Sequence, residues 1–525
     1  MKKITNIIIA SLLIFACGGC DSFLDEFSQT YIRASQISDY DELLLGSVYL
    51  PSYQPNPSGG TYIYPSGSRS CDFLNMLDDD FNSVCAESYV STGSNLIALA
   101  YSSMHNRLFG FSCWQPDITN TVLSQQVADD ITWDDLYQRI AIVNTIIDEI
   151  DNMDASTEAD LADKNRVTGE SYFLRAQFYL ILVNLYGKPY DPATAATDLG
   201  VPLKISSGVE HDKDKDTQFD RTPVAEVYDQ IISDLQQAVN YLTISDKDVI
   251  YRASREAAVL LLSRVYLYTQ RWQEAKDLLE PEINASTYAL SSLVAGDTLG
   301  EDNYFLTEDN SEIIFSQGSL FSQLIMTGTA LDFCVSHDLY SLYDDNDMRR
   351  FFFSTAATDS IALSYKFITG SQRSKVSDVL MLRNAEAYLN IAEACAMLGD
   401  ASANTYLNAL RSMRIQGYSA QSYSGEELVS QIRNERRKEL CFEGHRWFDL
   451  RRYSVSNPYP YSKRIYRSYP FYTGSGTGNL NYIYTYVLEE NDPAYVFDIP
   501  VNVKDFDTVP MPGNDRPDRP ALEEQ

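Results

Sequence analysis

Histidine, tryptophan and basic residues are scarce in this chain of 525 residues. It has 4 His and 4 Trp, and its 41 Lys and Arg face 73 Asp and Glu, for a formal net charge of −32 at pH 7. A surface this negative repels the phosphates of nucleic acids and anionic lipid headgroups, which argues against a nucleic-acid-binding protein. Beyond the N-terminus, no apolar run approaches the ~18 residues that a membrane-spanning helix needs.

Motifs of common catalytic and metal sites are also missing from the sequence. It contains no GxSxG, HExxH or P-loop motif and no CxxC pair, and its histidines are scattered. The acidic run Asp78–Asp80 lacks the spacing of a calcium-binding loop, and we expect it to be a solvated turn. The sequence therefore predicts no catalytic residue, no metal site and no cofactor.

Apolar and aromatic residues are plentiful. Apolar residues make up 44% of the chain and charged residues 22%, which suits a folded protein with a sizeable core. There are 37 Tyr, whose flat ring and polar tip suit wet binding surfaces as well as ordinary helix packing.

The N-terminus is typical of an exported lipoprotein. Met1-Lys2-Lys3 precedes about a dozen mostly apolar residues, a secretory signal too short to span a bilayer. The next stretch, Ala16-Cys17-Gly18-Gly19-Cys20, resembles a lipobox, in which a cysteine is acylated and becomes the first mature residue. We expect residues 1–19 to be a signal peptide and Cys20 to carry lipid such as palmitate. There are two alternatives: Cys17 is the anchor, or the signal is an ordinary cleaved one and the cysteine occurs there by chance.

Six further cysteines follow, none at metal-ligand spacing. Export would permit a disulfide, for which Cys71, Cys85 and Cys113 are the candidates, although buried thiols explain each of them equally well. Cys395 and Cys441 lie in helical patterns and are expected in the core.

Apolar residues recur with helical period in paired segments. We predict helices over 134–153, 159–186, 222–242, 254–268, 273–279, 378–398, 402–413 and 425–452. Three of them share a register in which an alanine is followed by apolar residues four and seven positions later. The three sets are Ala176, Leu180 and Val183; Ala258, Leu262 and Val265; and Ala385, Leu389 and Ala392. The small residue allows a neighbouring helix to approach closely, as in tetratricopeptide hairpins.

These segments predict a mostly α-helical fold of tetratricopeptide-like hairpins within one domain, residues 20–525. The hairpins occupy about 129–279 and 378–453, and long irregular insertions occupy about 51–128, 284–376 and 455–525. The polar tail from Pro510 is expected to be only partly ordered.

The last predicted helix resembles the signature of a known family. From Asn434 to Arg452 it reads NERRKELCFEGHRWFDLRR, similar to the SusD/RagB surface lipoproteins of Bacteroidetes nutrient-uptake systems. Further matches follow the family's order, at Cys20–Asp25, Trp133–Asn144, Leu185–Pro189, Gly200–Leu203, Arg221–Tyr228, Asn310–Phe315 and Arg383–Ala394. The chain departs from the family at Phe497–Pro500, and the family's closing Asn-Pro-Gly-Tyr is missing. The resemblance therefore does not extend to the C-terminal tail.

The resemblance implies a function and a partner. It implies a lipid-anchored protein of the outer membrane, facing the cell exterior, that binds an oligosaccharide and delivers it to a SusC-like, TonB-dependent transporter without catalysis. Asp21, Asp25 and Glu26 resemble the acidic signals that take such lipoproteins to the outer face. Two alternatives remain: an oligopeptide-binding member of the same family, and a surface glycoside hydrolase.

Glu435, Glu439 and Glu443 recur every four residues in the last predicted helix, where like charges repel unless cations lie among them. Arg436 and Arg446 are placed to pair with Glu439 and Glu443. The hydrolase alternative would make these carboxylates an acid/base pair. We interpret them instead as buried ion pairs that hold this helix to the hairpins.

Sugars are recognised by stacking on aromatic rings, while polar side chains bind their hydroxyls. By resemblance, the ligand-contacting aromatics come from the segment before the first conserved helix and from the central insertion. The candidates before the first conserved helix are Tyr62, Tyr64 and Trp114. Those in the central insertion are Tyr304, Phe305 and Phe321.

The two tryptophans Trp114 and Trp447 are expected in different environments. Trp114 lies in a proline-containing loop without helical register, so we expect an accessible ring. Trp447 belongs to an apolar stripe and is expected in the core. The tyrosines between 459 and 486 are interpreted as interface or packing.

Overall fold

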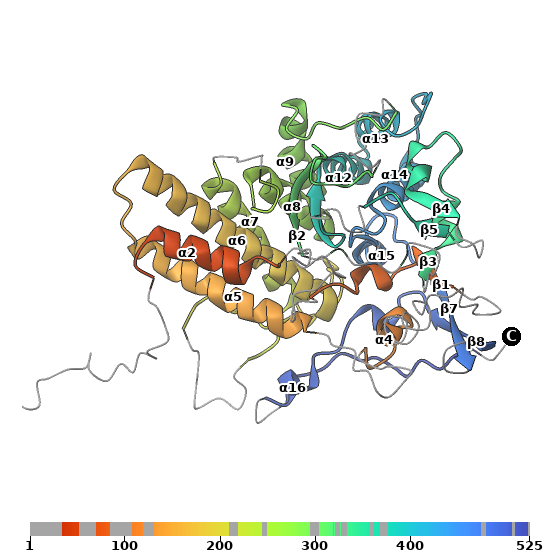
Figure 1. Ribbon diagram of the computed structural model, residues 1–525, viewed down its shortest axis with the longest axis horizontal. Coiled ribbons are helices and arrows are strands. Elements are labelled where there is room, and N and C mark those ends of the chain that lie inside the picture. The colour runs from red at the N-terminus through yellow and green to blue at the C-terminus, as the bar shows by residue number, and fades with distance from the viewer. Residues whose placement is uncertain are drawn as a thin grey trace, which may run out of the picture.

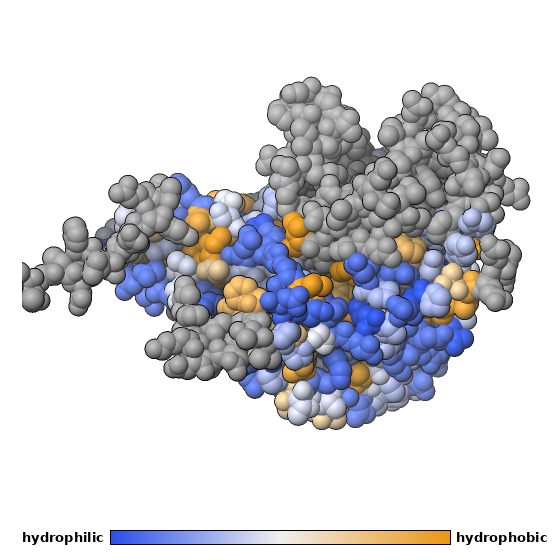
Figure 2. Space-filling view, turned by 90° about the horizontal axis from the view of Figure 1, so that it is seen from below, coloured by the Kyte–Doolittle hydropathy of each residue, from blue (hydrophilic) through white to orange (hydrophobic). Residues whose placement is uncertain are grey.

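Paired helices and small β-sheets make up the described part of the chain (Figure 1). The computed structural model describes residues 34–51, 70–84, 108–118, 131–208, 219–243, 249–294, 304–318, 320, 326, 333–355, 361–367, 376–473, 479–506 and 510–522. None of the described helices is long and apolar enough to cross a membrane. The described surface seen in Figure 2 is mainly hydrophilic, with apolar residues in separate small patches.

The helices form a layered array in which successive members pack side by side. They are α2 (Ile37–Leu43), α5 (Thr132–Glu149), α6 (Glu158–Tyr186), α7 (Val224–Tyr241), α8 (Arg255–Tyr268), α9 (Trp272–Asn284), α12 (Asn384–Met397), α13 (Ala403–Ser412), α14 (Gly425–Leu440) and α15 (Arg446–Ser454). Helix α6 packs between α5 and α7, α8 packs against α7 and α9, and α12 contacts α9, α13 and α14. The predicted mostly α-helical fold is confirmed.

Local sequence explains where these helices begin and how closely they pack. Thr157 and Asp160 form a capping box at the start of α6, and Ser254 Oγ accepts the Ala257 N–H at 3.1 Å at the start of α8. The small residues of the shared register, Ala176, Ala258 and Ala385, are all 0% exposed. Each therefore lies where a neighbouring helix approaches.

Two predicted helices differ from the structure. The range 378–398 begins with strand β6 (Leu380–Arg383), which pairs antiparallel with β2 (Ile313–Gln317) before α12 starts. The range 425–452 is broken between α14 and α15, where Phe442 (φ 57°) and Gly444 (φ 76°) adopt left-handed backbone conformations. A Cβ on Gly444 would lie 2.5 Å from the Val379 carbonyl oxygen, so glycine is required at this turn.

The insertions contain more regular structure than expected. Strands β1 (Phe81–Ser83), β3 (Phe333–Val335), β5 (Ile361–Leu363) and β4 (Phe353–Thr355) form one antiparallel sheet in that order, which joins the first and second insertions. The third insertion folds as the hairpin of β7 (Ile465–Thr473) and β8 (Asn479–Leu488).

The C-terminal tail packs back onto the third insertion. Arg519 donates to Asp492 at 2.6 Å, and the Leu522 N–H donates to the Thr485 carbonyl oxygen at 2.8 Å. These contacts hold the tail between residues 510 and 522, and residues 523–525 lie outside the described residues.

Candidate functional site

Trp114 is a core residue. It follows the short helix α4 (Phe109–Ser112), and its side chain is 1% exposed. Its indole N–H donates to the Leu77 carbonyl oxygen at 2.7 Å, and the Arg467 guanidinium carbon lies 5.4 Å from the ring centroid. The expectation of an accessible ring is wrong, because the indole is enclosed by packing that links the first and third insertions.

The structure describes two more of the predicted ligand residues. Phe305 is fully buried and stacks on Phe352, with 5.1 Å between ring centroids. Tyr304 is partly exposed, and its ring lies 5.9 Å from that of the exposed Tyr365. Tyr62, Tyr64, Phe321 and the predicted anchor Cys20 lie outside the described residues. Among the described candidates, Tyr304 is thus the one whose ring a ligand can reach.

The glutamates of the signature segment are enclosed in ion pairs. Glu435, Glu439 and Glu443 are at most 2% exposed. Arg349 bridges Glu435 (2.6 Å) and Glu439 (2.8 Å), and Arg383 bridges Glu439 (2.7 Å) and Glu443 (2.7 Å). Burial by itself would raise the pKa of Glu439, but the arginines outweigh it and hold that pKa well below its usual range. The interpretation as structural ion pairs is confirmed.

Arg436 and Arg446 do not pair with the glutamates for which they were predicted. Arg436 binds Asp449 at 2.8 Å, and Arg446 binds Asp79 at 2.7 Å. The helix ends after Leu440, so Arg446 begins a separate helix that faces the first insertion.

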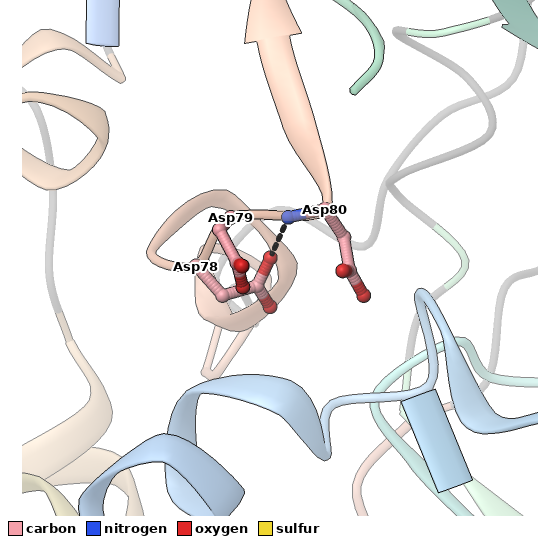
Figure 3. A group of neighbouring side chains, drawn as sticks. All are labelled: Asp78, Asp79 and Asp80. Carbon is pink, nitrogen blue, oxygen red and sulfur yellow. Dashed lines mark hydrogen bonds between the residues drawn. The ribbon is translucent and has the colours of Figure 1, made fainter. Parts of the chain in front are cut away.

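The acidic run Asp78–Asp80 is buried, so the prediction of a solvated turn is wrong (Figure 3). Asp79 pairs with Arg446 at 2.7 Å, and Asp80 pairs with Arg437 at 2.7 Å. Asp78 accepts the Asp80 N–H at 2.9 Å, the bond drawn in Figure 3. Burial and the two neighbouring carboxylates raise the pKa of Asp78 well above its usual range. The three side chains offer oxygens within 4.8 Å of one another, but arginines already balance this charge, and we interpret the group as structural.

Four of the described cysteines are buried: Cys71, Cys113, Cys395 and Cys441. Burial raises the pKa of the Cys113 thiol to about 12, so it is protonated and unreactive at neutral pH. The core placement predicted for Cys395 and Cys441 is confirmed, and Cys85 lies outside the described residues.

A polar cleft opens between the start of the first insertion and strand β2 of the second insertion. We call it the junction cleft. Its volume is about 330 Å³, and it is lined by Leu45, Gly46, Ser47, Tyr49, Leu50, Pro51, Arg139, Tyr251, Ser316 and Gln317. One wall is the π-helix of residues 44–48, a wide turn of the kind that is frequent at functional sites, and the other is the end of β2.

Hydrogen bonds between distant segments fix the two walls of the junction cleft. The Leu50 N–H donates to Gln317 Oε1 at 2.9 Å, and the Gly318 N–H donates to the Leu50 carbonyl oxygen at 3.4 Å. Gln317 Nε2 donates in turn to Gln177 of α6. After Pro51 the chain continues into residues 52–69, which contain Tyr62 and Tyr64. After Gly318 it continues toward Phe321. These are three of the predicted ligand residues.

Arg139 of α5 holds the C-terminal end of the π-helix in place. Its Nη1 donates to the carbonyl oxygens of Ser47, Val48 and Tyr49 at 3.0–3.1 Å, and its Nη2 binds Asp135 at 2.9 Å. The carbonyl groups at this helix end are thereby satisfied, and the cleft wall is held by a charged group.

Tyr251 lines the junction cleft and carries an unsatisfied hydroxyl. Its hydroxyl is shielded from solvent and has no hydrogen-bond partner among the described residues. Burial, reinforced by the charges of Glu308 and Asp309, raises the pKa of Tyr251 to about 12, so the hydroxyl stays protonated at neutral pH. A buried hydroxyl without a partner costs ~1–3 kcal/mol. Sequence reasoning missed Tyr251 because it lies between two helices, in neither variable insertion.

A second cavity, of about 350 Å³, is almost wholly apolar. Trp133, Tyr137, Phe219 and Phe506 form much of its lining. The Tyr137 hydroxyl is already bonded to the Pro202 carbonyl oxygen at 2.7 Å. A ligand rich in hydroxyl groups would lose hydrogen bonds to water there without replacing them, so the junction cleft is the better candidate site.

Comparison with protein families gives two matches along the chain. Residues 73–267 match a family described as starch-binding and associating with the outer membrane, and residues 353–516 match the SusD family.

Two curated relatives come from Formosa agariphila. SusD-like protein P25 is 27% identical over 319 residues, which are 60% of this chain and 51% of the relative. SusD-like protein P2 is 26% identical over 377 residues, 61% of this chain and 71% of the relative. The chain thus spans about half the length of the first relative.

Solved structures share the fold. A SusD superfamily protein from Bacteroides thetaiotaomicron has a TM-score of 0.64 at 21% identity and covers 92% of this chain and 100% of its own. A SusD-like carbohydrate binding protein from Bacteroides vulgatus has a TM-score of 0.61 at 20% identity and covers 89% of this chain and 96% of its own. With the helix-hairpin fold, the signature segment and both family matches in agreement, this chain belongs to the SusD/RagB family.

Proposed function

We propose that this protein is a cell-surface lipoprotein, anchored at Cys20, that binds an oligosaccharide and delivers it to a SusC-like, TonB-dependent transporter of the outer membrane. The observation that carries the proposal is the junction cleft. It is a polar, preformed cavity, and the bond between Leu50 and Gln317 fixes it between the start of the first insertion and strand β2 of the second. Such a cavity suits sugar hydroxyls, which need donors and acceptors held in place.

Binding without catalysis is supported by the placement of the acidic side chains. A glycoside hydrolase needs two carboxyl groups that flank the scissile bond. Glu435, Glu439 and Glu443 are buried and bound to arginine or lysine, and no carboxylate is among the described residues that line the junction cleft.

The test screens residues 21–525 on a glycan array and against an oligopeptide library. We expect a defined glycan class to bind, and Tyr251→Phe and Tyr304→Ala to weaken that binding. Tyr461→Ala is the matched control, because Tyr461 is 43% exposed and lines neither the junction cleft nor the apolar cavity. Binding of peptides in place of glycans would favour the oligopeptide alternative, and release of reducing ends would favour the hydrolase.

The transporter partner has its own test. Full-length protein extracted from outer membranes in mild detergent should co-purify with a TonB-dependent transporter. Recovery of the protein alone under several detergents would contradict this part of the proposal.

A further inference from the structure

A second cleft lies between α15 and the segment that follows β8. We call it the Arg451 cleft. Its volume is about 580 Å³, and its lining includes Arg451, Asn491, Asp492, Tyr495 and Asn514. It shares no lining residue with the junction cleft.

Arg451 is a buried cation with few bonds. Its side chain is 2% exposed, and its Nη2 donates to the Gly187 carbonyl oxygen. Nε and Nη1 are shielded from solvent and have no hydrogen-bond partner among the described residues. Burial lowers the pKa of Arg451 to about 10, so the guanidinium still carries its charge at neutral pH. The next residue, Arg452, shows the usual arrangement, since it pairs with Glu393 at 2.6 Å.

Trp447 adds another unsatisfied donor beside Arg451. The two residues lie one turn apart on α15, so their side chains share a face of the helix. The Trp447 indole N–H is buried and has no partner among the described groups. Tyr495, a half-buried residue of the cleft lining, stacks on the indole with 4.5 Å between ring centroids. Three donor nitrogens on this part of α15 are thus without an acceptor, each at a cost of ~1–3 kcal/mol.

The carboxylates of the cleft do not supply that acceptor. Asp492 accepts from Arg519 at 2.6 Å and from the backbone N–H groups of Glu489 and Ala494 at 2.9 Å. Asp515 is exposed at the rim. Arg451 therefore stands apart from the ion-pair networks that balance its neighbours.

We propose that the Arg451 cleft binds an oxyanion, a sulfate or carboxylate group, which accepts hydrogen bonds from Arg451 and Trp447. Guanidinium groups are well suited to such anions because their donors are planar, fixed and always charged. Arg451 lines the cleft, and Trp447 lies one turn before it on α15. The anion is either a free inorganic ion or the acidic group of a sugar, and the inference does not depend on the proposed function.

The test measures thermal unfolding and calorimetric binding of the full-length protein in detergent. The probes are sodium sulfate, sodium glucuronate and uncharged glucose at constant ionic strength. We expect sulfate, glucuronate or both to bind and raise the melting temperature by several degrees, and glucose to do neither.

Arg451→Met is the decisive variant. It should fold, because it removes a buried charge that lacks a counter-ion. We expect its affinity for the anion to fall ~10-fold or more, the loss typical of a charged hydrogen bond. Arg464→Met is the matched control and should respond like wild type, because Arg464 has a 52% exposed side chain. Trp447→Phe, which keeps a ring but removes the N–H, should weaken binding less than Arg451→Met does.

The outcomes separate the sources of the anion. A response to sulfate alone supports a site for a free inorganic ion, and a response to glucuronate supports recognition of an acidic sugar. An Arg451→Met protein that binds the anion as well as wild type, or a wild type that binds neither anion, would overturn the proposal.

Discussion

The backbone N–H of Leu50 donates to the side-chain carbonyl of Gln317 at 2.9 Å, across a separation of 267 residues. The bond joins the start of the first insertion to the end of β2, inside the second insertion. It fixes the two walls of the junction cleft against each other.

Tyr251→Phe should weaken ligand binding and leave stability unchanged or slightly higher. The change removes a hydroxyl that has no protein partner, so nothing in the fold loses a bond. If the ligand uses that hydroxyl, affinity should fall ~10-fold. Calorimetric titration with the glycan found on the array, alongside a thermal melt, measures both effects. Unchanged affinity would place Tyr251 outside the site.

Trp114→Ala should destabilise the fold severely. The indole is 1% exposed and its N–H is bonded, so truncation leaves a cavity and an unsatisfied carbonyl oxygen at Leu77. The expected loss is ~3–5 kcal/mol of unfolding free energy, measured by urea denaturation. Trp447→Ala should cost a similar amount, since its side chain is also 1% exposed. A Trp114→Ala protein as stable as wild type would contradict the core assignment.

Stability should fall in acid in two stages. Burial lowers the pKa of His445 well below 6.5, so the unfolded state binds its proton more readily and stability starts to fall below about pH 6.5. Arginines hold the pKa of Glu439 well below 4.5, so its stabilisation is present above that pH and is lost as pH falls further. Urea denaturation from pH 8 to pH 3 measures both stages. Asp345→Asn is the control, because that side chain is 99% exposed. A flat profile would contradict the buried ion-pair network.

Chelation of metal should not change the melting temperature. Asp79 and Asp80 are balanced by Arg437, Arg446 and Lys463, so no divalent cation is needed to keep this group in place. Thermal melts with EDTA and with added calcium check this. Asp79→Asn, in contrast, should lower stability because it leaves buried cations underpaired. A melting temperature that falls with EDTA and recovers with calcium would reveal a metal site at the group.

Cys20→Ala should abolish lipid attachment and release the protein from the outer membrane. The lipid supplies most of the membrane affinity of a surface lipoprotein. Metabolic labelling with palmitate and membrane fractionation measure the two effects, and Cys17→Ala should retain the label. A label that persists in Cys20→Ala would make Cys17 the anchor.

Sequence alone determined the helical array and the family. The register of Ala176, Ala258 and Ala385 predicted close helix packing, and all three residues are buried there. Periodicity and capping are local, so they can be read from neighbouring residues. The signature segment could be recognised in the same way, because its residues are contiguous.

Tertiary structure decided the parts that depend on distant partners. Trp114 looked like a loop residue, and only the contacts from Leu77 and Arg467 show it to be core. Arg446 was matched to a glutamate on its own predicted helix but binds Asp79, 367 residues away. Hydrogen bonds and ion pairs in the interior form between groups that folding brings together, and linear spacing carries no information about which those groups are.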